Sequence, residues 1–399
     1  MRVLFLAHRV PWPPDKGDRL RSDAILRWLC ARHEVHLGAL ADTSSAEEAR
    51  ATEEQLAGIC ASVRIVPRPS AWRGFRAVAS GRSISEEAFR STELEAFIRS
   101  ASERVPLDAA LGYSSQMARP LFTLPAPRRV IDLVDVDSRK WQRRFAHSHN
   151  PVYWLEARRV RALELACLKQ LDAVTVVSRR EAAALGGESG RVRVMRMGVD
   201  LRRFPMRRDD PGGARLAFVG AMDYPPNAEG VLWFAREVLP QVRQRHPEAT
   251  LVVVGRHPPK ALHVLPGVEV LGWVDDVRLI LEKCVSAVVP IHTSHGVQTK
   301  AVVTMALGVP QVLTHATLEG LEAEAGSHAL VASDASAFAD AVVCLLQRGD
   351  VRRRIAANAR QFAETNFDWE RNLAVLDDLL SVPTNGAGET SVSGTYPLT

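Results

Sequence analysis

The sequence has few cysteines and no long apolar run. Its five cysteines are an odd number with no closely spaced pair: Cys30, Cys60, Cys167, Cys284 and Cys344. This pattern argues against a disulfide framework or a zinc site and favours a reducing compartment. No stretch approaches the roughly 20 apolar residues that a membrane-spanning helix needs. The apolar segment Met1–Ala7 is too short for the core of a signal peptide. The sequence therefore predicts a cytoplasmic protein.

What the sequence does contain is typical of an ordinary globular chain. Of its 399 residues, 46% are hydrophobic and 24% are charged, and the length predicts two domains. The net charge is +5, and much of the excess lies between residues 139 and 161. These cations are either solvated helix faces or a surface that attracts an anionic acceptor or the inner membrane. Nucleic acid is not predicted, because no recognised nucleic-acid motif accompanies them.

Strand-like and helix-like segments alternate along the whole chain, and this pattern predicts parallel sheets. The expected strands of the first half are 2–7, 34–40, 62–66, 109–113, 129–134 and 173–177. After a turn-rich linker at 209–213 the pattern restarts with strands at 215–219, 250–254, 268–271, 285–290 and 309–314. The fold class is therefore α/β, with two Rossmann-like doubly wound domains facing each other across a cleft.

We expect an N-terminal domain that spans residues 1–208 and a C-terminal domain that spans residues 209–366. A final amphipathic helix at 367–381 should cross back to the first domain, because its apolar residues recur at helical spacing. The segment 382–399 is rich in Gly, Ser and Thr and predicts a disordered tail.

The segment Val285–Gly320 is the most informative part of the chain. It is expected to form a strand, a loop beginning at Gly296, a helix near Gln298–Leu307, a second strand, and an exit loop carrying Glu319 and Gly320. Such strand-exit loops and helix N-termini hold phosphates in doubly wound folds. The segment resembles the nucleotide-binding core of family 4 glycosyltransferases, which have the GT-B fold. Where that family has a pair of glutamates, this chain has His295 and Val303.

Two N-terminal segments resemble a bacterial sugar-transferase group associated with exopolysaccharide and exosortase-like export. The first, Pro11–Leu40, has Gly17 for close approach to a ligand and Asp18 as an expected helix cap. Its cations would either hold an acceptor phosphate or the donor diphosphate, or be surface charges; they are Lys16, Arg19 and Arg21. The second, Val130–Arg144, places three carboxylates after a strand: Asp132, Asp135 and Asp137. They would bind an acceptor hydroxyl, cap the strand exit or, least favoured, hold a metal ion.

In the second half, the segment 220–227 resembles the same group's "G.MD..PN" motif, and Lys300 matches its helix lysine. Lys300 is the leading candidate for a cation that neutralises a leaving diphosphate, although a lysine in a first helical turn is often only solvated. Trp273 either flanks the nucleotide base or packs in the core.

Together, the motifs and the resemblance predict the following site, without a metal or a cofactor. The catalytic candidates are Asp135, Asp137 and Lys300. The donor-binding candidates are Gly17, Gly220, Met222, Asp223, Arg256, Trp273, His292, His295, Gly296, Val297, Gln298, Lys300, Val303, Glu319 and Gly320. The acceptor-binding candidates are Lys16, Asp18, Arg19, Arg21, Lys140 and Trp141.

The resemblance implies a retaining glycosyltransferase that uses a nucleoside diphosphate sugar as donor and a glycan, lipid-linked or natural-product acceptor. It also implies that the N-terminal domain, 1–208, binds the acceptor and that the C-terminal domain, 209–366, binds the nucleotide sugar. The absent glutamates leave two alternatives open. One is a GT-B enzyme with other chemistry, such as a nucleotide-sugar epimerase or a pseudo-glycosyltransferase. The other is a degenerate, non-catalytic partner of a transferase.

Overall fold

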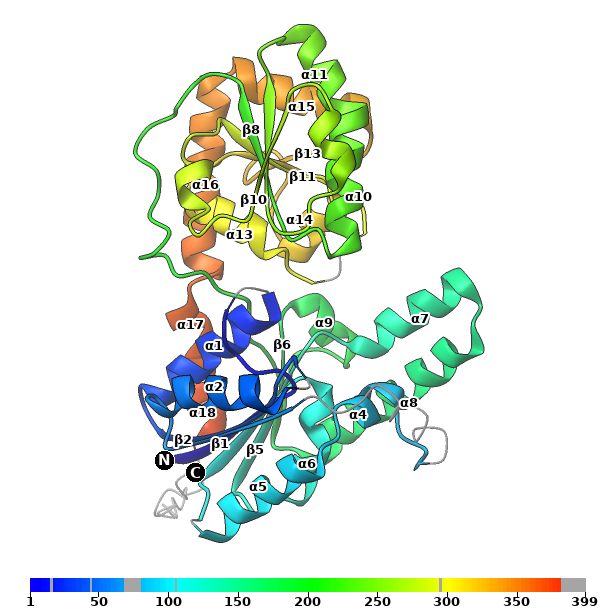
Figure 1. Cartoon of the computed structure of the whole chain (residues 1–399), viewed down its shortest axis with the longest axis vertical. Coiled ribbons are helices and arrows are strands. Elements are labelled where there is room, and N and C mark those ends of the chain that lie inside the picture. Colours follow the sequence, from blue (N-terminus) through cyan, green and yellow to red (C-terminus); the bar gives the residue numbers. More distant parts are fainter. Residues whose placement is uncertain (15–16, 44, 68–79, 105, 294–295, 382–399) are drawn as a thin grey trace, which may run out of the picture.

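The computed structural model of the protein describes residues 1–14, 17–43, 45–67, 80–104, 106–293 and 296–381. Two α/β domains lie one above the other along the longest axis, each built around one sheet (Figure 1). Within the described residues, the N-terminal sheet has the strand order β3-β2-β1-β4-β5-β6-β7 and the C-terminal sheet has the order β10-β9-β8-β11-β12-β13. Every strand pair is parallel.

The N-terminal sheet consists of β1 (Arg2–Ala7), β2 (Glu34–Leu40), β3 (Ser62–Val66), β4 (Ala109–Tyr113), β5 (Arg128–Val134), β6 (Ala173–Val176) and β7 (Val192–Val194). Its helices are α1 (Gly17–Cys30), α2 (Ala46–Ala57), α4 (Ile84–Ala88), α5 (Thr92–Arg104), the 3-10 turn η2 (Ser115–Met117), α6 (Ala118–Thr123), α7 (Asp137–Ser148), α8 (Pro151–Gln170) and α9 (Arg179–Ala184).

The C-terminal sheet consists of β8 (Arg215–Val219), β9 (Thr250–Val254), β10 (Val268–Gly272), β11 (Ser286–Val289), β12 (Gln311–Leu313) and β13 (Leu330–Val331). Its helices are α10 (Pro225–Trp233), the π-helical turn η3 (Phe234–Val238), α11 (Leu239–Arg245), the 3-10 turn η4 (Lys260–Val264), α12 (Arg278–Leu281), α13 (Thr299–Ala306), α14 (His315–Leu321), α15 (Ala335–Gln347) and α16 (Gly349–Asn366).

The two sheets share one topology, and this confirms the two doubly wound domains expected from the sequence. In each sheet the strand order reverses beside the first strand, between β1 and β4 and between β8 and β11. Ligands of open α/β sheets bind at the carboxyl ends of the strands next to such a reversal. The central strands are apolar on both faces, and β4 and β6 are buried along their whole length because helices cover both sides.

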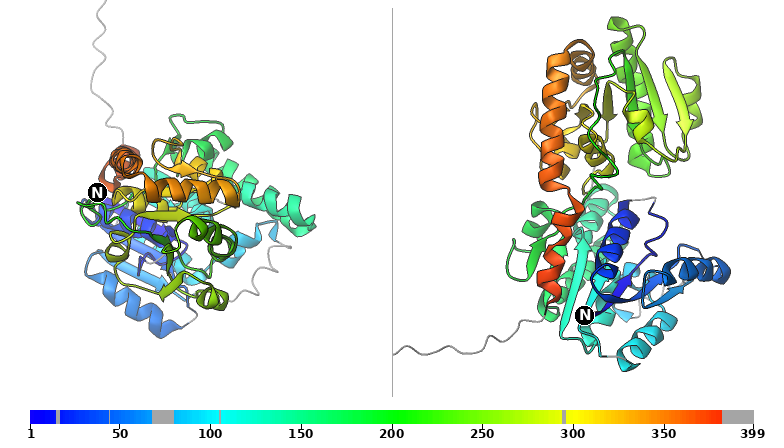
Figure 2. Two further views of the ribbon diagram at one scale, coloured as in Figure 1. Left: turned by 90° about the horizontal axis from the view of Figure 1, so that it is seen from above. Right: turned by 90° about the vertical axis from the view of Figure 1, so that its left-hand side faces the viewer.

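The chain returns to the N-terminal domain after α16, through α17 (Trp369–Leu373) and α18 (Val375–Leu380). Figure 2 shows these segments continuing along one side of both domains. Leu373, Leu376 and Leu380 are buried in a core cluster with strands β1 and β2, and Trp369 packs against that cluster. The apolar spacing thus identified the buried residues, but the structure divides the single helix expected from the sequence into two.

Other local expectations need correction. The helical segment from α10 to α11 is not one regular helix, because it contains the π-helical turn η3, followed by Pro240, which has no N–H for the helical ladder. Glu319 and Gly320 lie within α14 and not in an exit loop. The cysteines include a spatially close pair, because the Sγ atoms of Cys30 and Cys60 are 3.7 Å apart, although all five thiols are free. The predicted tail, 382–399, lies outside the described residues.

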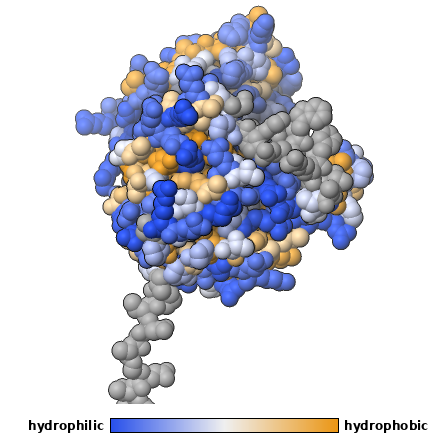
Figure 3. All heavy atoms as spheres, turned by 60° about the horizontal axis from the view of Figure 1, so that its bottom comes forward, coloured by the Kyte–Doolittle hydropathy of each residue, from blue (hydrophilic) through white to orange (hydrophobic). Residues whose placement is uncertain are grey.

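The face seen in Figure 3 is mainly hydrophilic, with small separated hydrophobic patches. Among the residues that the structure describes, no helix has both the length and the apolar character required to cross a bilayer.

Candidate functional site

A cleft of about 1440 Å³ lies between the two domains. Its walls come from the loop after β1 and helix α1 on one side. On the other side they come from the ends of β8, β9 and β10 and from the start of α13. The cleft therefore opens at the carboxyl edges of both sheets, beside their reversal points. It is lined by ten predicted site residues: Gly17, Asp18, Gly220, Asp223, Arg256, Trp273, Val297, Gln298, Lys300 and Val303.

Two helix N-termini meet across this cleft. Helix α1 begins at Gly17 and α13 begins at Thr299, and a Cβ placed on Gly17 would lie 3.3 Å from the Thr299 side-chain oxygen. Figure 1 shows α1 directed towards α13 from the opposite domain. A helix N-terminus has unpaired N–H groups and a partial positive charge. The region between the two helices is therefore suited to an anion.

Lys300 adds a side-chain cation to this region. Its Nζ lies 2.5 Å from the Asn227 side-chain oxygen and 3.2 Å from that of Gln298, and both partners are neutral amides. Burial lowers the pKa of Lys300 to about 7. A lysine in the first turn of a surface helix would be hydrated, so the structure rules out the solvated alternative. Because no opposite charge is among these partners, an anion in the cleft would stabilise the ammonium form.

The backbone at Gly220 makes room for this arrangement. A Cβ at Gly220 would lie 2.8 Å from the Asn227 side-chain nitrogen and 3.1 Å from Cε of Lys300. Asn227 also donates a hydrogen bond of 2.7 Å to the carbonyl of Ala221. Asn227 was absent from the predicted site, although the "PN" of the motif contained it. The Asn227 side chain thus holds the segment that follows β8, through Ala221, and also positions Lys300.

Further along the same wall, Arg256 and Trp273 follow β9 and β10. The Arg256 guanidinium lies 4.3 Å from the centre of the Trp273 ring, and 55% of Trp273 is exposed. An exposed indole is not a core residue, so the core-packing alternative is wrong. The stacked pair offers a flat ring and a cation to the cleft.

The wall around Val303 is apolar. Val303 lines the cleft and packs with Phe204, Val219 and Val277 against a small core cluster. A hydroxyl group facing this wall would find no acceptor in these side chains. This part of the cleft thus differs chemically from the polar region around Lys300.

Asp135 lies where the domains approach each other beyond the cleft. A Cβ on Gly296 of the C-terminal domain would be 3.0 Å from one Asp135 carboxylate oxygen. That buried oxygen has no hydrogen-bond partner among the described residues. The pKa of Asp135 is raised to about 7, first by burial and then by the charges of Glu181 and Asp137. Burial also raises the pKa of Asp137, the first residue of α7.

The structure corrects the assignment of two predicted acceptor cations. Arg21 is 1% exposed and forms a buried ion pair with Asp132, with a nitrogen–oxygen distance of 2.7 Å. Its other nitrogens donate to the carbonyls of Met195 and Arg196, so it cannot reach an acceptor. Arg19 is also buried and is paired with Asp42. Both partners are far from the arginines in sequence, which is why the motif alone misassigned them. The third carboxylate of the motif, Asp132, is consequently structural.

Several other predicted residues do not line the cleft. Met222 is buried in the core, and His292 packs against Trp233 with ring centres 4.5 Å apart. Glu319 forms an ion pair of 3.3 Å with Arg180 of the other domain. Lys140 and Trp141 lie on α7, outside the cleft, and Gly320 is inside α14. Lys16 and His295 lie outside the described residues.

Asp18 follows the first residue of α1 and is therefore not its cap. Its carboxylate forms an ion pair with Arg9 at 3.0 Å.

Tyr224 is another cleft residue that was absent from the predicted site. It lines the cleft, and its pKa is raised by burial and by the charge of Asp135. A carboxylate of the N-terminal domain therefore acts electrostatically on this residue of the C-terminal domain. The only signal of Tyr224 in the sequence was its place inside the "G.MD..PN" motif.

For metals, no group of three or more His, Cys, Asp or Glu residues in the described ranges could hold an ion. The prediction of a metal-free reaction stays a prediction.

Residues 213–348 match the family described as "Glycosyl transferases group 1". The match covers the C-terminal domain as far as the end of α15, including the cleft wall that carries Gly220, Arg256, Trp273 and Lys300. A glycogen synthase of Mycobacterium tuberculosis (strain ATCC 25618 / H37Rv) is 26% identical over 232 residues, which are 54% of this chain and 55% of the relative. An uncharacterized 44.6 kDa protein in the cps region of Klebsiella pneumoniae is 24% identical over 179 residues, 42% of this chain and 46% of the relative. The chain thus spans about half the length of the curated relatives it matches.

Solved structures resemble this chain over nearly its whole length. HepE from Anabaena, solved in complex with UDP, has a TM-score of 0.69 at 16% identity and covers 95% of this chain and 99% of its own. Sucrose-phosphate synthase from Thermosynechococcus elongatus has a TM-score of 0.68 at 16% identity, covering 95% and 98%. WaaG, a glycosyltransferase involved in lipopolysaccharide biosynthesis, has a TM-score of 0.65 at 16% identity, covering 96% and 100%. The GT-B fold expected from the sequence is confirmed.

Proposed function

We propose that this protein is a glycosyltransferase that moves a sugar from a nucleoside diphosphate sugar to a glycan, lipid-linked or natural-product acceptor. The observation that carries the proposal is Lys300, a cation with only neutral partners, placed where the N-termini of α1 and α13 meet in the interdomain cleft. The group 1 match over the same domain supports it.

In this proposal the donor diphosphate lies at Lys300 and at the start of α13, where backbone N–H groups and the ammonium neutralise the charge that develops on the leaving group. Gly220, Val297 and Gln298 shape this region. Arg256 and Trp273 contact the nucleotide, with the indole beside the base. Gly17 and Asp18 face the donor from the N-terminal domain, and Gly296 lies close to the Asp135 carboxylate.

The acceptor enters from the N-terminal side. Asp135 has a buried, unpartnered carboxylate oxygen and a pKa of about 7, so it exchanges a proton readily near neutral pH. We propose that Asp135 orients or deprotonates the acceptor hydroxyl and that Asp137 supports its charge state. Retention of the anomeric configuration follows from the resemblance to family 4 and is part of the proposal.

The apolar wall at Val303 favours one second candidate, a transferase relative that no longer binds a donor. Calorimetric titration with uridine, guanosine, thymidine, adenosine and cytidine diphosphates separates the two. Saturable binding of one of them supports the transferase. The absence of binding to all five supports the non-catalytic candidate.

A pair of glycine variants locates the site. Gly220→Ala should weaken diphosphate binding, because the new Cβ displaces Asn227 and Lys300. Gly190→Ala is the matched control, since a Cβ at Gly190 meets no atom within 4 Å. Equal affinities of both variants and the wild type would place the donor elsewhere.

A further inference from the structure

The helical hairpin formed by α7 and α8 projects from the N-terminal domain, away from the rest of the molecule (Figure 1). The two helices pack against each other, and the rings of Trp141 and Tyr153 lie 5.6 Å apart. Between residues 138 and 155, which form most of α7 and the first turn of α8, the sequence has four arginines and lysines and no acidic residue. We call this part of the hairpin the hairpin tip.

The opposite charges that act on the cations of the hairpin tip are carboxylates near the start of α7: Asp135 and Asp137 attract Lys140, and Asp135 and Glu181 attract Arg143. Within the described ranges, Arg139, Lys140, Arg143 and Arg144 form no ion pair. The pKa of Arg143 is lowered, first by partial burial and then by the charges of Arg139 and Arg180. The positive charges on this surface therefore repel one another, and a negatively charged partner would relieve the repulsion.

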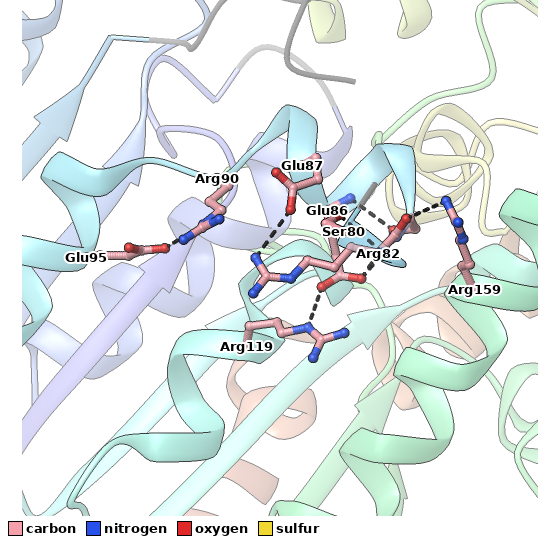
Figure 4. A network of polar contacts seen from close by, with 9 residues as sticks. Ser80, Arg82, Glu86, Glu87, Arg90, Glu95, Arg119 and Arg159 are labelled. Carbon is pink, nitrogen blue, oxygen red and sulfur yellow. Dashed lines mark hydrogen bonds and ion pairs between the residues drawn. The ribbon is translucent and has the colours of Figure 1, made fainter. Parts of the chain in front are cut away.

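Charges at the base of the hairpin are paired instead. Figure 4 shows Arg82 bound to Glu87, Arg119 bound to Glu86, and Arg159 of α8 donating to the carbonyl of Arg82. Glu156 of α8 is buried and accepts hydrogen bonds from the N–H groups of residues 84 and 85. These contacts fix α8 to α4, so the hairpin tip is carried on an anchored base.

Exposed apolar side chains accompany the unpaired cations. Val152, Trp154 and Leu155, in the first turn of α8, are 47%, 45% and 37% exposed. The Arg158 guanidinium lies 4.8 Å from the centre of the Trp154 ring, and that of Arg144 lies 4.9 Å from the Trp141 ring. Indole rings with arginines beside them suit the interface of a membrane, where the ring lies among the headgroups and the cation meets phosphate.

We propose that the hairpin tip docks on the surface of an anionic phospholipid bilayer. Charge complementarity selects this partner, and the exposed apolar turn adds an insertion that a soluble polyanion would not need. The hairpin begins two residues after Asp135, and α7 with its twelve residues spans about 18 Å. A lipid-linked acceptor held at the bilayer surface would therefore lie within reach of the cleft.

The test is co-sedimentation of the full chain with vesicles of mixed phosphatidylglycerol and phosphatidylcholine. We expect binding that weakens as salt is added, and no binding to vesicles of phosphatidylcholine alone. The Arg143→Glu/Arg144→Glu variant should lose at least about tenfold in vesicle affinity. Arg353→Glu/Arg354→Glu is the matched control, because it reverses two adjacent exposed arginines on a helix of the other domain.

A second variant tests whether the exposed apolar side chains of the hairpin tip contribute to vesicle binding. Trp154→Ala should weaken vesicle binding several-fold, whereas Val264→Ala, at an 80% exposed site of the C-terminal domain, should not. Circular dichroism checks that every variant is folded. Failure to bind the mixed vesicles, equal binding to phosphatidylcholine, or equal losses in the hairpin and control variants would each overturn the proposal. Binding of a DNA oligonucleotide through Arg143 and Arg144 without vesicle binding would also overturn it and reassign the surface.

This proposal concerns the acceptor side of the transferase proposed above, but the vesicle measurement requires neither donor nor turnover. Titration of the same hairpin variants with the nucleoside diphosphate should give wild-type affinity. A negative vesicle result would consequently leave the donor site untouched, and a negative titration would leave the membrane surface untouched.

Discussion

Arg21 and Lys300 are cations removed from bulk water on opposite sides of the cleft, and their partners are very different. Arg21 is surrounded by the Asp132 carboxylate and two backbone carbonyls. Burial would lower the pKa of Arg21, but the attraction of Asp132 outweighs this effect and raises it. Lys300 contacts two neutral amide oxygens, and burial lowers its pKa to about 7.

The difference separates a structural cation from a binding cation. The charge of Arg21 is already satisfied, so the pair with Asp132 ties α1 to the centre of the N-terminal sheet. Lys300 has hydrogen bonds to two neutral amides but no counterion in the free protein, and a bound anion would supply one. The sequence motifs assigned Arg21 to the acceptor and Lys300 to the donor, each as a cation that binds a ligand, and only their partners show which of the two charges is already satisfied.

The largest effect should come from breaking the Arg21 pair. Asp132→Ala removes the carboxylate, which also accepts hydrogen bonds from Thr175 and from the N–H of Val134, and leaves Arg21 buried without a counterion. We expect a loss of about 3–5 kcal/mol in the free energy of unfolding, measured by urea denaturation. Lys300→Met is the control and should be neutral or stabilising, because it strands no charge. Similar losses in both variants would show that the two cations do not differ as we describe.

The second largest effect concerns ligand affinity. Lys300→Ala should weaken nucleoside diphosphate binding by about ten- to a hundredfold, since a charge-assisted hydrogen bond contributes about 1.5–3 kcal/mol. Isothermal titration calorimetry measures the change. Lys283→Ala, at another lysine of the same domain that does not line the cleft, is the control. Unchanged affinity in Lys300→Ala would remove Lys300 from the donor site.

The pH dependence of binding should follow the same lysine. An anion favours the ammonium form, so the pKa of Lys300 rises on binding from its free value of about 7. Above pH 7 the free side chain is neutral and binding takes up a proton. Affinity should therefore fall as the pH rises, by at most about tenfold per pH unit.

Two variants isolate this effect. Lys300→Met should flatten the decline above pH 7, whereas Asp135→Asn, which removes another group with a pKa of about 7, should leave it in place. Calorimetry in buffers of different ionisation enthalpy reports the proton uptake directly. A wild-type affinity that is constant between pH 7 and 9 would contradict the prediction.

The smallest effect should come from the apolar wall. Val303→Glu introduces a carboxylate that can accept from ribose hydroxyls, but it also removes packing against Val219 and Val277. We expect stability to fall by about 1 kcal/mol and affinity for a ribonucleoside diphosphate to rise less than tenfold. Val303→Leu, which keeps the wall apolar, should not raise affinity. If the 2′-deoxynucleotide gains as much as the ribonucleotide in Val303→Glu, the wall does not face the ribose.

Motif spacing predicted the positions of some cleft residues correctly and failed for others. Gly220, Arg256 and Trp273 follow three separate strands of one parallel sheet, so their carboxyl-end positions placed them together. Glu319 was misplaced because Thr314 caps α14 directly after β12, where a loop was expected. Asn227 was missed because its role depends on contacts with Ala221 and Lys300, and the second of these is 73 residues away.

The sequence by itself determined the alternation of strands and helices, the two parallel sheets, and the segments that end at their carboxyl edges. These features depend on local periodicity and on the apolar character of short runs, and both are properties of residues that are close together in the sequence. Only the tertiary structure decided which charges are satisfied. The pairing of Arg21 with Asp132 joins residues 111 positions apart, and the neutral surroundings of Lys300 include Asn227, which is 73 positions away. Burial and partners fix the energy of a charge, and neither can be read from its neighbours in the chain.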